Sequence, residues 1–236
     1  MAKSIVFDAG PIITLATNNL LYLLDELKKD FNGDFIMPSA VKKELVDRPL
    51  QSKRFKFEAL QVLSCINKGT LKVVDDPKAN EEANSLLDIA NRIFRAKGNY
   101  IQIVHIGEIS AVALAVSMNS LAFIVDERTI RMLIENPENL KEIMEHKLHT
   151  NIEIDRKSLE EFKKRTKGIN MIRSTELIVV AYEKGLLDNY IPKNFEMEEP
   201  RKELIDALLW GLKLNGCAIS EKEIEKIIKI ETKRKL

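Results

Sequence analysis

The chain has 236 residues, of which 45% are hydrophobic and 31% are charged, with nine Gly and seven Pro. These proportions exclude a disordered or fibrous protein and predict a globular protein with a sizeable apolar core. The net charge of +1 excludes attraction of nucleic acid by the whole molecule, so a polyanion would have to meet a local basic patch. No apolar run approaches the length of a membrane helix, and Asp8 interrupts the stretch that a signal peptide would keep apolar. We therefore expect a cytoplasmic protein with no membrane partner.

The two cysteines, Cys65 and Cys217, lie far apart in the chain and form no CxxC pair. This spacing argues against a structural zinc site, and a disulfide is not expected in a reducing compartment. His146 and His149 could share one helix face, but no third ligand accompanies them, and a solvated helix end is the simpler interpretation.

Short apolar segments alternate with amphipathic ones along the first 126 residues. In chain order, the pattern predicts a strand at 4–8, a helix from 12 to 32, a strand at 35–38, a helix capped by Ser39, a helix at 57–67, a strand at 71–74, a helix from a cap at Asp76 to residue 95, a helix after Gly107, and a strand at 121–126. Strands that alternate with helices favour an α/β fold with a parallel sheet covered on both faces.

The regular alternation weakens after Pro137. Residues 137–170 are highly charged, and we interpret them as an insertion with two helices around a short strand at 151–155. A helix near 174–187 closes the first domain, which we place at residues 1–187. Two further helices, the second with a capping box of Ser220 and Glu223, predict a C-terminal helical extension at 188–236 that packs on this domain.

Four acidic residues occupy related positions in the predicted fold. Asp8 and Asp126 each end a buried strand, and ligands of open parallel sheets bind beyond the carboxyl ends of the strands. Glu44 lies in the first turns of the helix after the second strand. Glu108 lies in the first turn of the helix before the strand at 121–126. We expect all four carboxylates to converge at one edge of the sheet.

Clustered carboxylates repel one another and are costly to bury without compensation. A hard cation with oxygen ligands, Mg²⁺ or Mn²⁺, would resolve this, and it could polarise a phosphoryl oxygen and activate a water. Without metal, the repulsion predicts that Asp126→Asn leaves the fold equally stable or more stable. The alternative is that each acid is a helix cap or a partner of a helix dipole. Four caps are less expected, because Glu44 and Glu108 lie among apolar residues.

The segments VFDAGPIITLA, MPSAVKKEL, HIGEISAVALA and AFIVDERTIR resemble, in this order, the four acidic motifs of PIN-domain proteins. The tail ALLWGLKLNGCAISEKEIEKII resembles the C-terminal helices of a VapC-like prokaryotic subgroup. The resemblance implies that residues 1–187 form a three-layer nuclease domain that cleaves RNA with Mg²⁺ or Mn²⁺. Its catalytic and metal-binding positions fall on Asp8, Glu44, Glu108 and Asp126. It also implies a homodimer and an antitoxin-like or ribonucleoprotein partner.

The chain departs from this family pattern at two positions. Many members carry Ser or Thr two residues after the first aspartate, where this chain has Gly10. Many have a further acid shortly after the last aspartate, and here Glu127 is directly adjacent and is a candidate secondary acid. Whether the site holds one metal ion or two stays open.

Three basic residues, Lys53, Arg54 and Lys56, follow the Glu44 helix and are candidates for RNA binding. The alternative is that they form a solvated charged face. The leading hypothesis is therefore a metal-dependent endoribonuclease. The alternative hypothesis is a catalytically silent PIN-like scaffold that binds RNA or a partner protein. A small-molecule phosphohydrolase is less favoured, because FDAGP lacks the DxDxT pattern of enzymes that form an aspartyl-phosphate.

Overall fold

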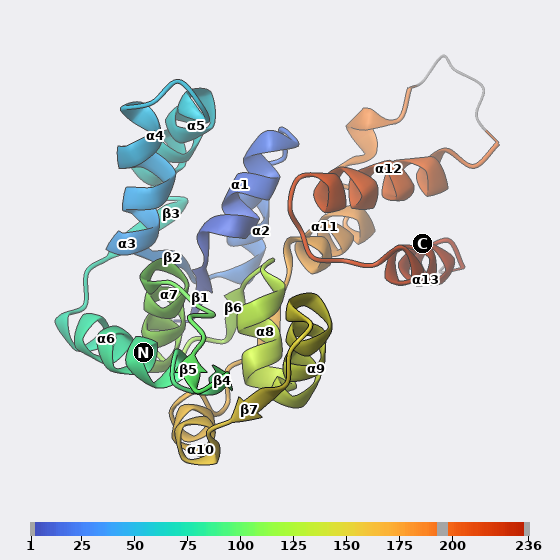
Figure 1. Ribbon diagram of the computed structural model, residues 1–236. Helices are drawn as coiled ribbons and strands as arrows, with labels where there is room; N and C mark the ends of the chain where they lie inside the picture. Colours follow the sequence, from blue (N-terminus) through green and yellow to red (C-terminus); the bar gives the residue numbers. More distant parts are fainter. Residues whose placement is uncertain (1–2, 193–197, 234–236) are drawn as a thin grey trace.

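The computed structural model describes residues 3–192 and 198–233. A five-stranded parallel sheet occupies its centre, in the order β3-β2-β1-β6-β8, of which β3, β2, β1 and β6 are labelled in Figure 1. The strands are β1 (Ser4–Phe7), β2 (Asp34–Pro38), β3 (Leu71–Val74), β6 (Ala122–Ile124) and β8 (Met171–Ile172). Helices flank this sheet, and the predicted three-layer α/β/α fold is confirmed.

The helices follow the predicted order for most of the chain. They are α1 (Ala9–Thr17), α2 (Leu23–Phe31), α3 (Ser39–Lys42), the π-helical turn η1 (Lys43–Asp47), α4 (Arg48–Leu50), α5 (Lys56–Asn67), α6 (Pro77–Ala90), α7 (Ile106–Ser117), α8 (Arg128–Glu135), α9 (Pro137–Leu148), α10 (Arg156–Arg165), α11 (Ser174–Glu183), the 3-10 turn η2 (Asp188–Tyr190), α12 (Pro200–Leu214) and α13 (Glu221–Glu231).

The core lies around β1 and the helix α7. All four residues of β1 are buried, as expected of a central parallel strand that is covered on both faces. Helix α7 contacts β1, β2 and β6, and three alanines, Ala111, Ala113 and Ala115, are buried along it. Burial of this small-residue helix against the sheet places the first turn of α7, which includes Glu108, near the end of β1.

Two predicted helices differ from the sequence pattern, one by a break and one at its first residue. The predicted helix from 12 to 32 is two helices, because Asn19 adopts a left-handed conformation with φ of 59°. The Leu20 N–H donates to the Leu15 carbonyl and the Asn19 N–H to the Ala16 carbonyl, which is the Schellman pattern of a helix end. Ser39 is also not the cap of its helix: it is the first helical residue, and Pro38 occupies the cap position without a side-chain hydrogen bond.

The predicted helix from 77 to 95 was wrong at its C-terminal end. Helix α6 stops at Ala90, and the Asn91 side chain accepts hydrogen bonds from the N–H groups of Ile103 and Val104. The chain then forms a small antiparallel sheet in the order β5-β4-β7, with β4 at Phe94–Ala96, β5 at Asn99–Tyr100 and β7 at Ile152–Ile154. Pairing of Phe94 with Ile154, 60 residues away, is a contact that local pattern could not predict.

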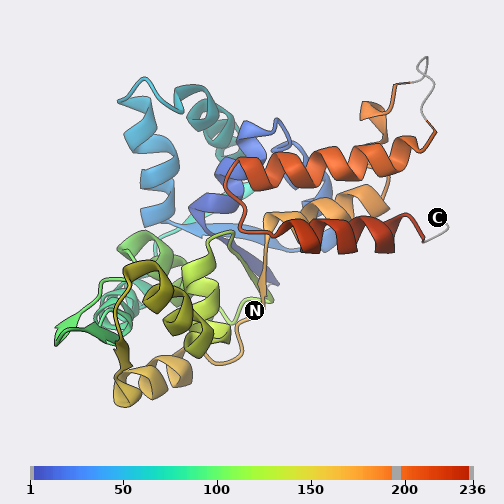
Figure 2. The ribbon, with the colours of Figure 1, turned by 45° about the vertical axis from the view of Figure 1, so that its right-hand side comes forward.

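The charged segment 137–170 contains the two helices and the short strand that the sequence predicts, namely α9, β7 and α10. At the C-terminal end, α11, α12 and α13 lie side by side (Figure 2). The capping box of Ser220 and Glu223 is confirmed. The boundary between domains 1–187 and 188–236 stays a prediction. In the described part of the chain, no helix is long and apolar enough to cross a membrane.

Candidate active site at the carboxyl ends of the strands

Asp8 and Asp126 lie at the ends of neighbouring strands. Strand β1 pairs with β6, and the Asp8 N–H donates to the Ile124 carbonyl at 3.0 Å. Gly10, in the first turn of α1, lies between the two acids. A Cβ placed on Gly10 would be 3.6 Å from the Asp126 Cβ and 3.7 Å from the Asp8 Oδ2. The two aspartates therefore border the same space at the start of α1, as predicted from the strand ends.

Glu44 and Glu108 approach Asp8 from two other elements. Glu44 lies on the exposed side of η1, and a Cβ on Gly107 would be 3.1 Å from its Oε2. Glu108 follows Gly107 in the first turn of α7 and is half-buried. Glu108 and Glu44 are both close enough to Asp8 for their charges to repel its carboxylate. The structure thus brings these three acids together, with the small Gly107 allowing the close approach of Glu44.

Asp8 is a buried carboxyl group whose pKa is raised by burial and by two neighbouring acids. Burial raises its pKa to about 7, and the charges of Glu108 and Glu44 add to this, while the N–H groups of Ala9 and Gly10 act in the opposite direction. Burial likewise raises the pKa of Glu108, with contributions from the charges of Glu127 and Glu44. The His105 N–H donates to Glu108 at 3.0 Å and opposes this increase.

Within residues 3–192 and 198–233, no lysine or arginine forms an ion pair with Asp8, Glu44, Glu108 or Asp126. Over the same ranges, no three acidic, histidine or cysteine side chains are arranged closely enough to enclose a metal ion. Mg²⁺ and Mn²⁺ prefer oxygen ligands, and these four carboxylates offer such oxygens without a cationic side chain beside them. The chemistry of the donors fits such an ion, but the side chains would have to move to enclose it.

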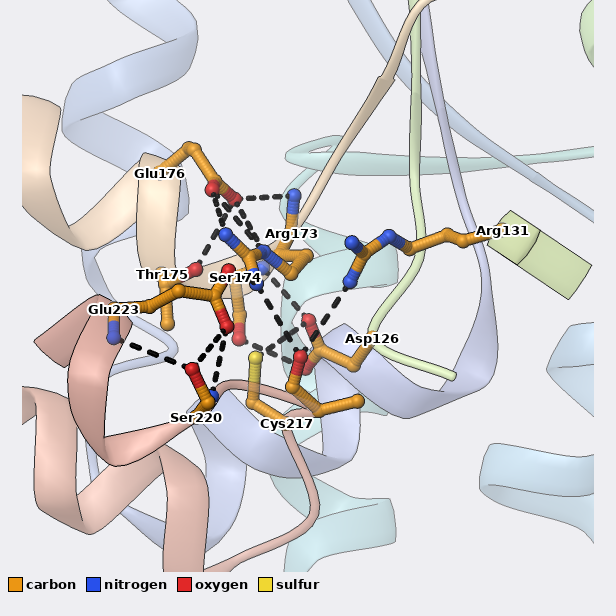
Figure 3. A network of polar contacts seen from close by, with 10 residues as sticks. Asp126, Arg131, Arg173, Ser174, Thr175, Glu176, Cys217, Ser220 and Glu223 are labelled. Carbon is orange, nitrogen blue, oxygen red and sulfur yellow. Dashed lines mark hydrogen bonds and ion pairs between the residues drawn. The ribbon is translucent and has the colours of Figure 1, made fainter. Parts of the chain in front are cut away.

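Asp126 differs from the other acids because its carboxylate is fully engaged by the protein. The side chain accepts hydrogen bonds from the Ser174 N–H at 2.8 Å, the Ser174 hydroxyl at 2.8 Å and the Cys217 thiol at 3.3 Å (Figure 3). Ser174 is the first residue of α11, so the carboxylate lies at the positive end of this helix. This environment explains how a charged group that is 1% exposed is accommodated.

A wider polar network joins the Asp126 region to the C-terminal segment. Arg173 forms ion pairs with Glu176 at 2.7 Å and Glu223 at 3.0 Å, and it donates to the Ala218 carbonyl at 3.3 Å (Figure 3). The Ala218 N–H donates to the backbone carbonyl of Asp126 at 3.1 Å.

Sequence reasoning did not identify Arg173, Ser174 or Cys217 as neighbours of the site. Ser174 and Cys217 reach Asp126 across 48 and 91 residues of the chain, and Arg173 joins the network through Ala218. No local pattern signals contacts over such separations.

Glu127, the candidate secondary acid, is the N-cap residue of α8. Its Oε2 accepts a hydrogen bond from the Ile130 N–H at 2.9 Å. Its charge also acts on Glu108, so the side chain lies near the acidic group. The structure therefore assigns Glu127 a structural role as a cap and places its charge beside the candidate site.

A groove of about 770 Å³ runs beside Glu44 and Gly107. Its lining includes the basic residues Lys42, Lys43 and Arg48 and the amides of α6, Asn80 and Asn84. Lys42 pairs with Asp47, whereas Lys43 and Arg48 form no ion pair with any described acid. These basic residues were not identified from the sequence. A local signal was present, because Lys43 is adjacent to Glu44 and Arg48 follows it by four residues, or about one helical turn.

The predicted RNA-binding residues Lys53, Arg54 and Lys56 lie in and next to the turn between α4 and α5. Helix α3, η1 and α4 form an arm that starts at the end of β2, and this turn is at its outer end (Figure 1). Glu44 lies in the middle of the arm. The three basic side chains are exposed, and none of them lines the groove beside Glu44.

Comparison with known proteins identifies the family of this chain. A solved structure, that of VapBC2 from Rickettsia felis bound to a DNA fragment from their promoter, aligns with 72% of this chain and 98% of its own, at 14% identity and a TM-score of 0.43. No curated protein sequence matches the chain significantly. A family model described as PIN domain matches residues 4–141, which is more than half of the chain. The protein therefore belongs to the PIN-domain family.

Proposed function

We propose that this protein is a metal-dependent endoribonuclease that hydrolyses RNA phosphodiester bonds at the four-carboxylate site. The observation that carries the proposal is the buried carboxyl of Asp8, which is coupled to Glu108 and Glu44 and has no cationic partner among the described residues. A cluster of this kind is unfavourable as a purely structural feature, because each charge raises the proton affinity of the others. The membership of this chain in the PIN-domain family also supports a nuclease function.

Asp8, Glu44 and Glu108 would hold Mg²⁺ or Mn²⁺, with Asp126 as a fourth carboxylate held in place by Ser174. The bound ion would polarise a phosphoryl oxygen and lower the pKa of a bound water. The protein contributes the orientation of the acids and a dry environment around Asp8. Lys43 and Arg48 would bind the phosphates of the substrate strand in the groove.

A catalytically silent scaffold is the second candidate. The observation that favours it is the engagement of Asp126, whose carboxylate already accepts three hydrogen bonds from the protein. Such a scaffold would bind RNA or a partner protein without cutting RNA. A homodimer and an antitoxin-like or ribonucleoprotein partner also remain proposals that follow from the family resemblance.

RNA cleavage in defined metal conditions tests the proposal. End-labelled RNAs, both unstructured and folded, are incubated with manganese, magnesium or a chelator, using the parent, Asp8→Asn and the control Asp88→Asn. Asp88 is an exposed acid of α6. We expect internal cleavage by the parent and the control with either metal, and none by Asp8→Asn or in chelator. Cleavage that persists in chelator would refute the metal-dependent mechanism. RNA binding without cleavage in any metal would favour the scaffold.

A further inference from the structure

The turn at residues 52–57 alternates basic and aromatic side chains. The sequence here is Ser-Lys-Arg-Phe-Lys-Phe, and every one of these residues is exposed. Phe57 is 69% exposed and Phe55 is 37% exposed. Leu60, three residues after Phe57 on α5, is also 50% exposed, so both lie on one helix face. These large side chains therefore contribute little to the core.

The backbone of this turn holds Phe55 in an uncommon conformation. Phe55 has a φ of 59°, in the left-handed region that aromatic residues rarely adopt. The Ser52 hydroxyl donates to the carbonyls of Pro49 at 3.1 Å and Arg54 at 2.8 Å, and the Ala59 N–H donates to the Phe55 carbonyl at 3.0 Å. These contacts fix the turn. An exposed aromatic residue that is held in a strained conformation indicates a function for its side chain.

The cations of this turn are available to a ligand. Lys53, Arg54 and Lys56 form no ion pair with any acid of the described residues. The Arg54 guanidinium carbon lies 4.6 Å from the centre of the Phe55 ring, which is a cation–π contact. Exposed rings beside such cations are the two features with which proteins bind single-stranded nucleic acid, because rings stack on bases and cations bind phosphates.

We propose that the turn at residues 52–57 is a binding site for single-stranded RNA, in which Phe57 and Phe55 stack on unpaired bases. Lys53, Arg54 and Lys56 bind the flanking phosphates. This inference rests on the proposed function and adds to it a preference for unpaired substrate. The site lies on the same arm as Glu44, and η1 and α4 cover roughly 9 Å from Glu44 to Leu50 at a helical rise of about 1.5 Å per residue. One strand could thus contact the turn and the groove at Glu44.

Charge decides between RNA and a second copy of this chain as the occupant. A two-fold symmetric contact between two such turns would place the three cations of one copy opposite those of the other, which is unfavourable. A polyanion neutralises the same charges. The arrangement therefore favours RNA over self-association.

Binding measurements in chelator separate stacking from other apolar contacts. Fluorescence anisotropy compares a short oligouridylate with a blunt-ended RNA duplex, on the parent, Phe57→Leu and Phe57→Tyr, with Leu60→Ala as the control. Leucine keeps an apolar side chain but has no ring, whereas tyrosine keeps the ring. We expect Phe57→Leu to weaken oligouridylate binding by about 5- to 150-fold, the range that loss of one stacked base gives, and binding of the duplex to be little affected. Phe57→Tyr and Leu60→Ala should bind as the parent does.

Equal oligouridylate affinity of Phe57→Leu and the parent would refute the stacking site. Equal binding of the duplex and the oligouridylate by the parent would refute it as well. Sedimentation of the parent as a dimer that Phe57→Leu dissociates would show a second copy as the occupant and overturn the proposal. A parent that binds through Phe57 but never cleaves RNA would refute the nuclease alone. A parent that cleaves RNA while Phe57→Leu binds it normally would refute the stacking site alone.

Discussion

The carboxylate of Asp126 and the first residue of α11, Ser174, are joined by two hydrogen bonds of 2.8 Å, one from the backbone N–H and one from the hydroxyl. The contact spans 48 residues and attaches the closing helix to the end of β6. It makes Asp126 electrostatically unlike Asp8, whose pKa is raised by burial and by two neighbouring acids. The two aspartates should therefore respond in opposite ways when their charge is removed.

Asp126→Asn should destabilise the metal-free protein by about 1–2 kcal/mol, because the charge at the N-terminus of α11 and two charge-assisted hydrogen bonds are lost. This reverses the expectation drawn from repulsion among the acids alone. Asp126→Ala should cost more, since the buried donors of Ser174 are left unpaired. Urea unfolding in chelator measures both free energies of unfolding against the parent and Asp88→Asn. An Asp126→Asn variant that is more stable than the parent would contradict this interpretation of the contact.

Asp8→Asn should stabilise the metal-free protein, and the gain should grow with pH. The pKa of Asp8 is raised from 3.8 to about 7, so between these values the folded state binds a proton that the unfolded state has released. The free energy of unfolding of the parent therefore falls as pH rises from about 4 through about 7, by at most about 1.4 kcal/mol for each step of one in pH.

Urea unfolding of parent and Asp8→Asn at pH 4 and pH 8 measures this dependence. The two proteins should be alike at the lower pH, and the variant should be more stable at the higher pH. A constant difference between them, as Asp88→Asn should show, would mean that Asp8 does not titrate in this window.

Cys217 should react slowly with alkylating reagents in the folded protein. Burial raises the pKa of its thiol to about 12, and the thiol donates to Asp126, so reaction requires local opening of the C-terminal segment. Arg173→Ala removes the ion pairs with Glu176 and Glu223 and should accelerate the reaction roughly tenfold, which corresponds to about 1.4 kcal/mol.

Peptide mass spectrometry follows the alkylation of Cys217 and of Cys65, which serves as the internal reference. Arg201→Ala is the matched control, because Arg201 pairs with Asp188 in the same helical region and lies outside the Asp126 network drawn in Figure 3. A rate at Cys217 that Arg173→Ala leaves unchanged would show that Arg173 does not hold the C-terminal segment in place.

The central sheet and the meeting of Asp8 with Glu44 and Glu108 could be predicted from sequence, because the positions of acids at strand ends and in first helical turns are local patterns. The features that could not be predicted depend on contacts between residues that are far apart in the sequence. The pairing of β4 with β7 ended α6 early, and Ser174 and Cys217 reached Asp126 across 48 and 91 residues. A single sequence carries no signal for such pairings, and so it could not distinguish the environment of Asp126 from that of Asp8.

A calorimetric titration of manganese into the parent, Asp8→Asn and Asp88→Asn tests directly whether these carboxylates bind a metal ion. We expect the parent and Asp88→Asn to bind manganese and Asp8→Asn to bind it at least about tenfold more weakly, which is a loss of roughly 1.4 kcal/mol of binding free energy. Binding by the parent below pH 7 should also release a proton, since a carboxyl with a pKa of about 7 must ionise to act as a ligand. A parent that takes up no manganese, or an Asp8→Asn variant that binds it equally well, would contradict the assignment of these carboxylates as a metal site.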